Sequence, residues 1–265
     1  MNRIRKTFES LRTSGGKALV PYITPEYPFR GMTTSLLQTL EQAGADLIEV
    51  GIPFSDPLAD GKTIQHSSEV ALKNGATIET ILKNVSEFRR SSQLPVILMG
   101  YINPILRLRF ENFLSACKAA GVDGVIVPDL PPEEASEFVA ASDLSGMSNV
   151  FLIAPTTDEA RIRAIDALST DFSYCVSVTG VTGARDQFGA SGDLDGFLKR
   201  VKDNTTKPFV VGFGISRPEH VQHVWKFADG AVVGSSLINV MGETASPGDA
   251  LKAASRFLRS LRSTG

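Results

Sequence analysis

The stretch that constrains the fold most is residues 46–61, DLIEVGIPFSDPLADG. An apolar run ends on the carboxylate of Glu49, and a loop rich in glycine and proline follows, carrying Asp56 and Asp60. A strand interior disfavours glutamate, because a buried and unpaired carboxylate is costly unless it stays protonated. An acid at the C-terminal end of a strand, with a second acid on the next loop, suits general acid/base catalysis. Taken alone, however, such a pair is more often a helix-cap acid and a solvated loop acid.

The rest of the chain repeats this unit. Short apolar runs alternate with segments whose apolar residues recur every three or four positions, which is typical of amphipathic helices. The runs are residues 18–23, 46–50, 95–99, 124–127, 150–153, 173–178, 208–211 and 230–233. Their almost continuous apolar character indicates parallel strands that are buried on both faces. Eight such units in 265 residues predict a (β/α)8 TIM barrel, formed as one domain by residues 1–265.

The helical segments support this prediction. We expect helices over residues 32–43, 78–90, 110–120, 132–140, 160–168, 194–201 and 218–227, with Asp193 as an N-cap and Ser216 before Pro218 marking two of the starts. Ile4, Phe8 and Leu11 share one helical face, which predicts an N-terminal helix that caps one end of the core. The alternative is a doubly wound open sheet. That fold usually has a glycine-rich turn after its first strand, whereas residues 24–28 read TPEYP.

Composition excludes several classes of function. The chain is 42% hydrophobic and 21% charged with a net charge of −2, so we expect no nucleic-acid or membrane partner. No apolar run reaches about 18 residues, and the N-terminus lacks the apolar core of a secretory signal. Cys117 and Cys175 are interpreted as buried apolar residues in a reducing cytoplasm. The three histidines lack metal-ligand spacing, so we expect no metal site.

Glycine-bearing turns follow the last three runs. They read TGVTGA (residues 179–184), GFGIS (residues 212–216) and GSS (residues 234–236). Glycine lets the backbone approach a ligand and direct its N–H groups toward an anion. Ser235 opens a helix, whose N-terminus adds a favourable dipole. The glycines could serve tight turns alone, but three in consecutive late loops predict a phosphate site.

The remaining chemistry follows by elimination. Lys17 and Lys207 precede the first and seventh strands, so no lysine lies at the catalytic ends of strands and a Schiff-base aldolase is disfavoured. Without metal ligands, a metal-dependent aldolase is disfavoured too. These observations leave carboxylate-driven proton transfer on a phosphorylated substrate, by a lyase or an isomerase.

The motifs also resemble a known family. Residues 49–61, followed by TIQ at 63–65, closely resemble the signature of the tryptophan synthase α subunits. Further matches occur in order along the chain: PYIT (21–24), YINP (101–104), PDLP (128–131), SVTGVTG (177–183), GFGIS (212–216) and GS (234–235).

The resemblance implies retro-aldol cleavage of indole-3-glycerol phosphate to indole and glyceraldehyde 3-phosphate, a carbon–carbon lyase step in tryptophan biosynthesis. Glu49 would move protons as acid and base, and Asp60 would accept the indole N–H. We expect the drier Glu49 to have the higher pKa. Tyr174 matches a tyrosine near the catalytic glutamate, although a strand tyrosine is more often a packing residue. The expected substrate-binding residues are Tyr22, Tyr101, Thr182, Gly183, Phe213, Gly214, Gly234 and Ser235.

The resemblance also implies a partner. A β subunit carrying pyridoxal phosphate would receive indole within an αββα heterotetramer, and this chain itself would hold no cofactor. The loops that carry Asp56 and Thr182 would act as lids. Asp129 and Pro131 would lie at the partner face.

Two departures from the family pattern leave alternatives open. Lys62 stands where relatives usually have proline, and Pro25-Glu26-Tyr27 stands where they usually have a small residue, glycine and aspartate. Lys62 alone supports one alternative, a catalytically weak or inactive barrel that acts as an allosteric activator of the β subunit. Another is a sugar-phosphate isomerase or epimerase, against which the long motif at residues 49–61 argues.

Overall fold

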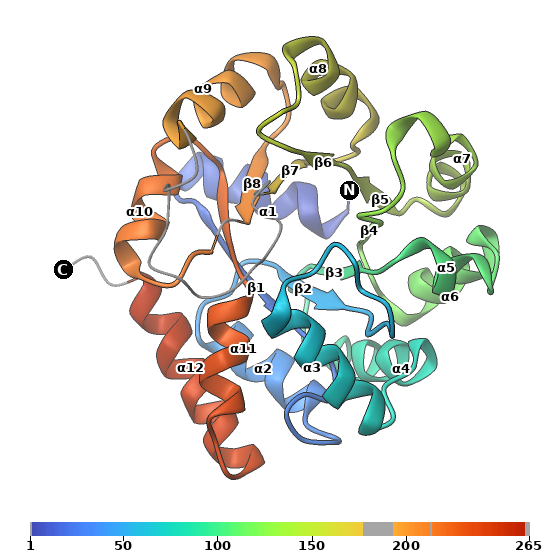
Figure 1. The fold of residues 1–265 in the computed structure, drawn as a ribbon, viewed down its shortest axis with the longest axis vertical. Helices are drawn as coiled ribbons and strands as arrows, with labels where there is room; N and C mark the ends of the chain where they lie inside the picture. The colour runs from blue at the N-terminus through green and yellow to red at the C-terminus, as the bar shows by residue number, and fades with distance from the viewer. Residues whose placement is uncertain (1, 177–192, 213, 263–265) are drawn as a thin grey trace.

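The computed structural model describes residues 2–176, 193–212 and 214–262, and these form the predicted barrel (Figure 1). Its strands are β1 (Ala18–Ile23), β2 (Ile48–Gly51), β3 (Val96–Met99), β4 (Gly124–Ile126), β5 (Ser148–Val150), β6 (Leu152–Ile153), β7 (Ser173–Val176), β8 (Phe209–Gly212) and β9 (Gly230–Val233). All paired strands are parallel, in the order β5-β4-β3-β2-β1-β9-β8-β7-β6.

The fifth predicted strand differs from the expectation of residues 150–153. It begins at Ser148 and is divided at Phe151 into β5 and β6. β5 pairs with β4, whereas β6 pairs with β7. β5 and β6 are consecutive pieces of one run, so the chain itself links the two ends of the strand order and closes the ring. Backbone hydrogen bonds from Thr170 to Asn149 (2.9 Å) and from Tyr174 to Phe151 (3.2 Å) join this run to the segment that leads into β7 and to β7 itself.

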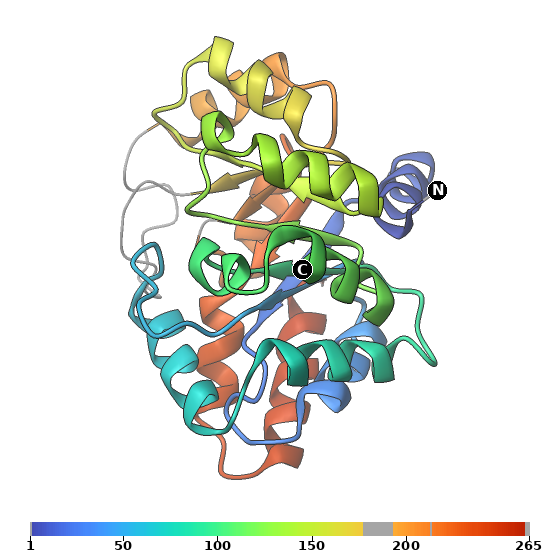
Figure 2. The ribbon, with the colours of Figure 1, turned by 90° about the vertical axis from the view of Figure 1, so that its right-hand side faces the viewer.

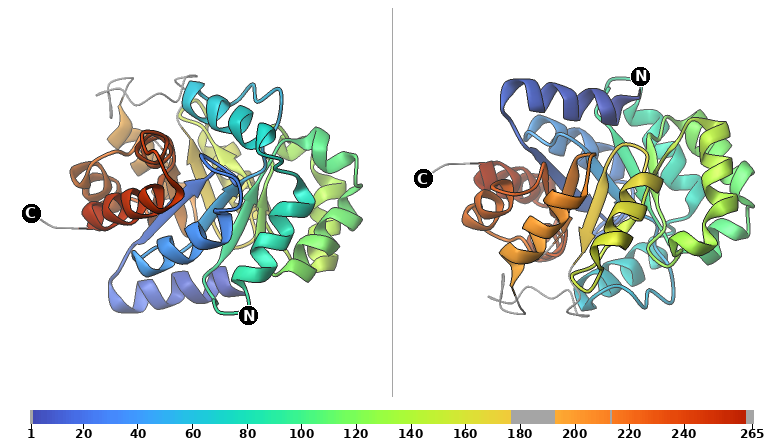
Figure 3. Two further views of the ribbon diagram at one scale, coloured as in Figure 1. Left: turned by 90° about the horizontal axis from the view of Figure 1, so that it is seen from below. Right: turned by 90° about the horizontal axis from the view of Figure 1, so that it is seen from above.

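Helices surround this ring in Figure 1, and the two side views of Figure 3 show them packed along the outside of the strands. They are α1 (Arg3–Ser14), α2 (Thr33–Gln42), α3 (Lys62–Lys73), α4 (Ile78–Phe88), α5 (Ile102–Leu106), α6 (Phe110–Ala120), η1 (Pro132–Glu134), α7 (Ser136–Ser145), α8 (Glu159–Leu168), α9 (Leu194–Asn204), α10 (Pro218–Trp225), α11 (Ser235–Gly242) and α12 (Pro247–Arg262). Among the described residues, no helix combines the length and apolar character needed to cross a membrane.

Two helix predictions need correction. The segment 132–140 is a 3-10 turn followed by α7, because the chain leaves helical geometry at Ala135. The N-cap of α10 is Arg217 rather than Ser216, since Pro218 is the first helical residue and forces an extended conformation on the residue before it. Asp193 is confirmed as an N-cap, and its carboxylate accepts a hydrogen bond from the backbone N–H of Gly196 (2.8 Å).

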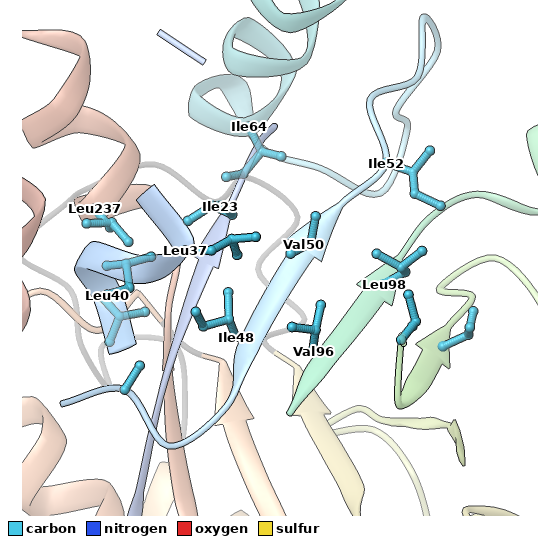
Figure 4. Close-up of a cluster of buried hydrophobic side chains, with 14 of the residues drawn as sticks. Ile23, Leu37, Leu40, Ile48, Val50, Ile52, Ile64, Val96, Leu98 and Leu237 are labelled. Carbon is cyan, nitrogen blue, oxygen red and sulfur yellow. The ribbon is translucent and has the colours of Figure 1, made fainter. Parts of the chain in front are cut away.

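Strand alternation sorts side chains into two buried layers. The outward residues of the strands, such as Ile48 and Val50, pack against the helices (Figure 4). The inward residues fill the barrel, and Leu47 belongs to that inner cluster. Glu49 is two residues beyond Leu47 and therefore points into the barrel, from the second residue of β2 and opposite Tyr22 near the C-terminal end of β1.

The N-terminal helix is a confirmed cap. Ile4 and Phe8 of α1 belong to the inner cluster, and the Phe8 ring lies 5.5 Å from that of Phe172, between centroids. In Figure 2, α1 and the loop that follows β2 lie at opposite ends of the barrel. The helix thus closes the end where the strands begin, and the other end remains for a site.

Candidate active site

Glu49 is the most unusual buried group at the C-terminal end of the strands. Its side chain is 1% exposed, and burial raises its pKa to about 8. The Tyr174 hydroxyl offsets part of that rise, and Asp60 adds to it. Within the described part of the chain, neither Glu49 oxygen has a hydrogen bond of good geometry, but the Tyr174 hydroxyl lies close enough to lower the pKa of Glu49. Glu49 is therefore mostly protonated at neutral pH and has a proton to give.

Two tyrosines flank this carboxyl group. Tyr22 pairs in register with Glu49 across β1 and β2, and Tyr174 enters from β7. Burial, followed by the charges of Asp60 and Glu49, raises the pKa of Tyr22 well above its usual value. Burial and Glu49 do the same to the pKa of Tyr174. Both tyrosines thus remain neutral hydroxyl groups beside the acids.

Glycines make the room that these tyrosines need. A Cβ atom at Gly51 would lie 2.0 Å from the Tyr22 hydroxyl oxygen, and one at Gly212 would lie 2.5 Å from that of Tyr174. Heavy atoms do not approach so closely, and hence any side chain at either glycine would displace a tyrosine. Sequence reasoning missed this role of Gly51 and assigned Gly212 only to a glycine-bearing turn. The one available signal was a glycine ending an apolar run.

Asp60 lies on the loop between β2 and α3. Its carboxylate accepts a hydrogen bond from the Tyr101 hydroxyl (3.0 Å), which in turn accepts one from the backbone N–H of Ala59 (3.0 Å). Gln65 of α3 donates to the backbone carbonyl of Asp60 (2.9 Å). Burial raises the pKa of Asp60 to about 6, and Tyr101 limits the rise. Asp60 is therefore mostly ionised at neutral pH, opposite to Glu49.

Tyr101 contacts the loop after β2. The sequence predicts a substrate-binding residue here, and the structure shows that the Tyr101 hydroxyl binds Asp60 and that its ring packs against Phe54, with ring centroids 5.4 Å apart. The ring is 7% exposed, because the loop after β2 covers it. The carboxylate that would bind substrate is therefore oriented by a residue 41 positions away along the chain.

The predicted phosphate side is described in part. Gly234 is the N-cap of α11, where no side chain among the described residues caps the helix, and Ser235 is its first residue. Ser236 donates to the carbonyl of Ile215 (3.1 Å) and so ties this helix start to the loop after β8. Gly214 adopts a left-handed φ of 47°. The backbone N–H groups at the start of α11 thus remain available to an anion. Thr182, Gly183 and Phe213 lie outside the described residues.

The acid side and the phosphate side meet at Tyr22. A Cβ atom at Gly234 would come 3.4 Å from the Tyr22 Cβ, while the hydroxyl of the same ring reaches Gly51 at the end of β2. Tyr22 therefore lies between the two carboxyl groups and the start of α11.

The predicted lid and partner residues lie on the loops that follow β2 and β4. Asp56 is exposed and accepts from the Ser55 hydroxyl (2.5 Å), on a loop where Leu58 is 92% exposed. Asp129 is exposed and accepts from the backbone N–H of Ile102 (2.9 Å), and Pro131 precedes η1. Lys62, one of the departures from the family pattern, is an exposed first residue of α3.

Other chemistry lacks support in the described residues. No group of three or more His, Cys, Asp or Glu side chains there could hold a metal ion. Cys117 and Cys175 are buried free thiols. Burial raises the pKa of Cys117 to about 12, so it is not a nucleophile at neutral pH.

Comparisons with known proteins agree with this geometry. The family described as "Tryptophan synthase alpha chain" matches residues 8–263. The tryptophan synthase alpha chain of Roseiflexus castenholzii is 49% identical over 99% of this chain and 100% of its own length. That of Geotalea daltonii is 52% identical over 90% of this chain and 89% of its own length.

Solved structures show the same fold. Tryptophan synthase subunit alpha from Legionella pneumophila superposes with a TM-score of 0.89 at 37% identity, covering 99% of this chain and 97% of that one. A chain from the tryptophan synthase a2b2 complex of Pyrococcus furiosus superposes with a TM-score of 0.86 at 42% identity, covering 92% of this chain and 97% of its own.

Proposed function

The chain belongs to the tryptophan synthase alpha chain family, and from this premise we propose how its residues cleave indole-3-glycerol phosphate to indole and glyceraldehyde 3-phosphate. One observation carries the assignment of roles: the buried Glu49, with its pKa raised to about 8, lies near Asp60, whose pKa is about 6. Two carboxyl groups with separated pKa values can hold opposite protonation states at one pH.

The first step uses the proton of Glu49. Glu49 donates it to indole C3, which turns the ring into a cationic indolenine. Asp60 accepts a hydrogen bond from the indole N–H, and its negative charge stabilises the positive charge that develops on the ring. Tyr101 keeps the Asp60 carboxylate in place for this contact.

The second step returns a proton to Glu49. The Glu49 carboxylate removes the proton of the glycerol 3′-hydroxyl. The bond between the carbon that carries this hydroxyl and indole C3 then breaks. The bonding electrons return to the ring, so indole leaves, and the former hydroxyl carbon becomes the aldehyde of glyceraldehyde 3-phosphate. Glu49 ends protonated, as it began, and is ready for another turnover. Tyr174, held in the space beside Gly212, acts as a positioning residue for Glu49.

The other end of the substrate supplies binding energy. We assign the phosphate to the backbone N–H groups of Gly214, Gly234 and Ser235, together with Gly183 and Thr182 of the preceding loop. Tyr22 and Phe213 would line the indole. Anchoring a remote phosphate holds the reacting carbon near Glu49. Such positioning lowers the activation free energy of cleavage, because the translational and rotational entropy is already lost when the substrate binds.

The partner follows from the family. The Pyrococcus furiosus relative belongs to an a2b2 complex, and we propose that this chain likewise pairs with a β subunit in the cytoplasm. That subunit would carry pyridoxal phosphate and condense the released indole with serine. We place Asp56, Asp129 and Pro131 on the lid and partner face, and we take residues 1–265 as one domain.

The decisive experiment measures indole release from indole-3-glycerol phosphate by the purified chain, with and without a tryptophan synthase β subunit. Glu49→Gln and Asp60→Asn should each abolish release while leaving the circular dichroism spectrum unchanged. A wild-type chain that releases no indole, yet still raises β-subunit turnover, would instead make this barrel an activator.

A further inference from the structure

Glu26 is an unusual residue in the loop between β1 and α2. It has a left-handed φ of 63°, a conformation that L residues other than glycine seldom adopt, and it is only 7% exposed. Glu26 belongs to Pro25-Glu26-Tyr27, one of the two departures from the family pattern noted in the sequence. Both the backbone and the buried charge require compensation from neighbouring groups.

Hydrogen bonds from several elements provide that compensation. The Glu26 carboxylate accepts from the backbone N–H of Gly31, from the Thr33 hydroxyl of α2 (2.8 Å) and from the Asn84 amide of α4 (3.2 Å). The Glu26 backbone carbonyl accepts from the Asn74 amide at the C-cap of α3 (2.8 Å). One residue therefore ties the loop to α2, α3 and α4.

The same loop contacts α3 at two further places. The Thr24 and Ser67 hydroxyl oxygens are 2.7 Å apart, and the Tyr27 ring lies edge-on to His66, with centroids 6.4 Å apart. α3 begins two residues after Asp60 and holds its backbone through Gln65. The position of α3, and with it that of Asp60, is thus set against the loop that Glu26 holds.

Tyr27 extends this contact to the phosphate side. A Cβ atom at Gly242 would lie 2.2 Å from the Tyr27 hydroxyl oxygen, so the tyrosine rests directly on the last residue of α11. α11 begins at Ser235, where the phosphate is assigned. Figure 1 shows α3 and α11 as neighbours, with the loop from β1 leading toward them. Tyr27 therefore contacts both the helix that follows Asp60 and the helix that would bind phosphate.

We propose that Glu26 is a positioning residue that sets the distance between Asp60 and the phosphate-binding start of α11, acting through Tyr27 and α3. This inference rests on the proposed function. It assigns the departure Pro25-Glu26-Tyr27 to substrate positioning. A ligand that contacts both Asp60 and the start of α11 depends on the distance between them, whereas a ligand that contacts only one of them does not.

The test compares one spanning ligand with its two halves. The spanning ligand is indole-3-propanol phosphate, which lacks the hydroxyl needed for cleavage, and the halves are indole and glycerol 3-phosphate. Calorimetry would give the dissociation constants of all three for the wild-type chain, for Glu26→Gln and for Glu26→Gly. Glycine accepts a φ of 63° without strain, so the second variant removes the carboxylate and relieves the backbone.

We expect the spanning ligand to bind about tenfold more weakly to both variants, and kcat/KM for cleavage to fall by a similar factor. The halves should bind within about twofold of the wild type. The matched control is Asp166→Asn, which removes another buried carboxylate, one that accepts from the N–H (2.9 Å) and hydroxyl (2.8 Å) of Thr206, just before β8. It should lower the melting temperature without changing the ratio of spanning to half-ligand affinity.

Two results would overturn the inference. Equal weakening of all three ligands would show a loss of stability alone, and unchanged binding of all three would show that Glu26 positions nothing. In both cases a wild-type chain that cleaves indole-3-glycerol phosphate leaves the proposed function intact. A wild-type chain that neither cleaves the substrate nor binds the spanning ligand would overturn both proposals.

Discussion

At the scale of single residues, the carboxyl groups of Glu49 and Asp60 differ in their hydrogen bonding. Asp60 has the Tyr101 hydroxyl on its carboxylate, whereas neither Glu49 oxygen has a partner in the described part of the chain. Burial raises both pKa values, to about 6 for Asp60 and about 8 for Glu49. The difference in pKa therefore arises mainly from local hydrogen bonding and burial, because the ordinary pKa values of the two groups, 4.5 and 3.8, differ by less.

The first prediction concerns the pH dependence of cleavage. The active form needs Asp60 ionised and Glu49 protonated, so kcat/KM should be highest between the two pKa values, about 6 and about 8. Below that window Asp60 gains a proton and no longer stabilises the cationic ring. Above it Glu49 has lost the proton that indole C3 must receive. A pH profile of indole release should thus be bell-shaped.

Tyr101→Phe provides the internal check on this profile. Tyr101 lowers the pKa of Asp60, so its removal should move the acidic limb to higher pH and leave the alkaline limb in place. A shift of both limbs, or of the alkaline limb alone, would contradict the assignment of the acidic limb to Asp60.

The second prediction concerns stability. The pKa of Glu49 is raised from 4.5 when unfolded to about 8 when folded, so its contribution is fully present below 4.5 and is lost as pH rises through about 8. Glutamine cannot ionise. Glu49→Gln should therefore stabilise the protein by a few kcal/mol at pH about 9 and by much less at pH about 5, measured by urea unfolding.

Glu133→Gln is the matched surface control for this gain. Glu133 is exposed, and its hydrogen bond from Arg161 lowers its pKa, so the substitution should bring no stabilisation at high pH. Equal gains from both glutamine variants would point to net charge rather than to the buried site.

At the scale of elements, the strand ends are shaped by glycines that leave space for tyrosine rings. The third prediction is that Gly51→Ala lowers kcat/KM by about a hundredfold, because the new methyl group would meet the Tyr22 hydroxyl at 2.0 Å and displace the ring between the acids and α11. Steady-state indole release measures the loss. Gly248→Ala in α12 is the control, since nothing lies within 4 Å of its added carbon, and activity should be unchanged.

The sequence predicted the elements better than their contacts. β1 has the expected bounds, because strand period and length are local properties of the chain, whereas β2 begins two residues later than expected and has Glu49 as its second residue. The hydrogen bond from Tyr101 to Asp60 and the space that Gly51 leaves for Tyr22 depend on packing between loops and strands far apart in sequence. Such contacts leave no periodic signal. The carboxylate of Glu26 similarly accepts from its own loop, from α2 and from α4, which no motif connects.

At the scale of the whole molecule, the two ends of the barrel have different tasks. Where the strands begin, α1 closes the ring through ion pairs from Arg3 to Asp123 (2.9 Å) and from Arg5 to Asp171 (3.0 Å). Where the strands end, a carboxyl group is left buried and unpaired in the described structure, a cost that the rest of the fold must offset. Because the two ends are separate, the molecule can hold an unpaired buried carboxyl group at one end while the other end, closed by α1, is well packed.

This division gives the last prediction, for Phe8→Ala. Phe8 is 6% exposed and contacts Phe172 inside the base of the barrel. Its truncation should cost about 3–5 kcal/mol of unfolding free energy, and a loss of that size should lower the melting temperature by roughly 10 °C in a chain of this length. The reacting groups lie at the opposite end, so kcat/KM at 25 °C should stay within about twofold of the wild type, provided the variant is folded. A fall in kcat/KM without any fall in melting temperature would show that α1 influences the acids directly, and the barrel could then no longer be described as a stabilising base with an independent catalytic rim.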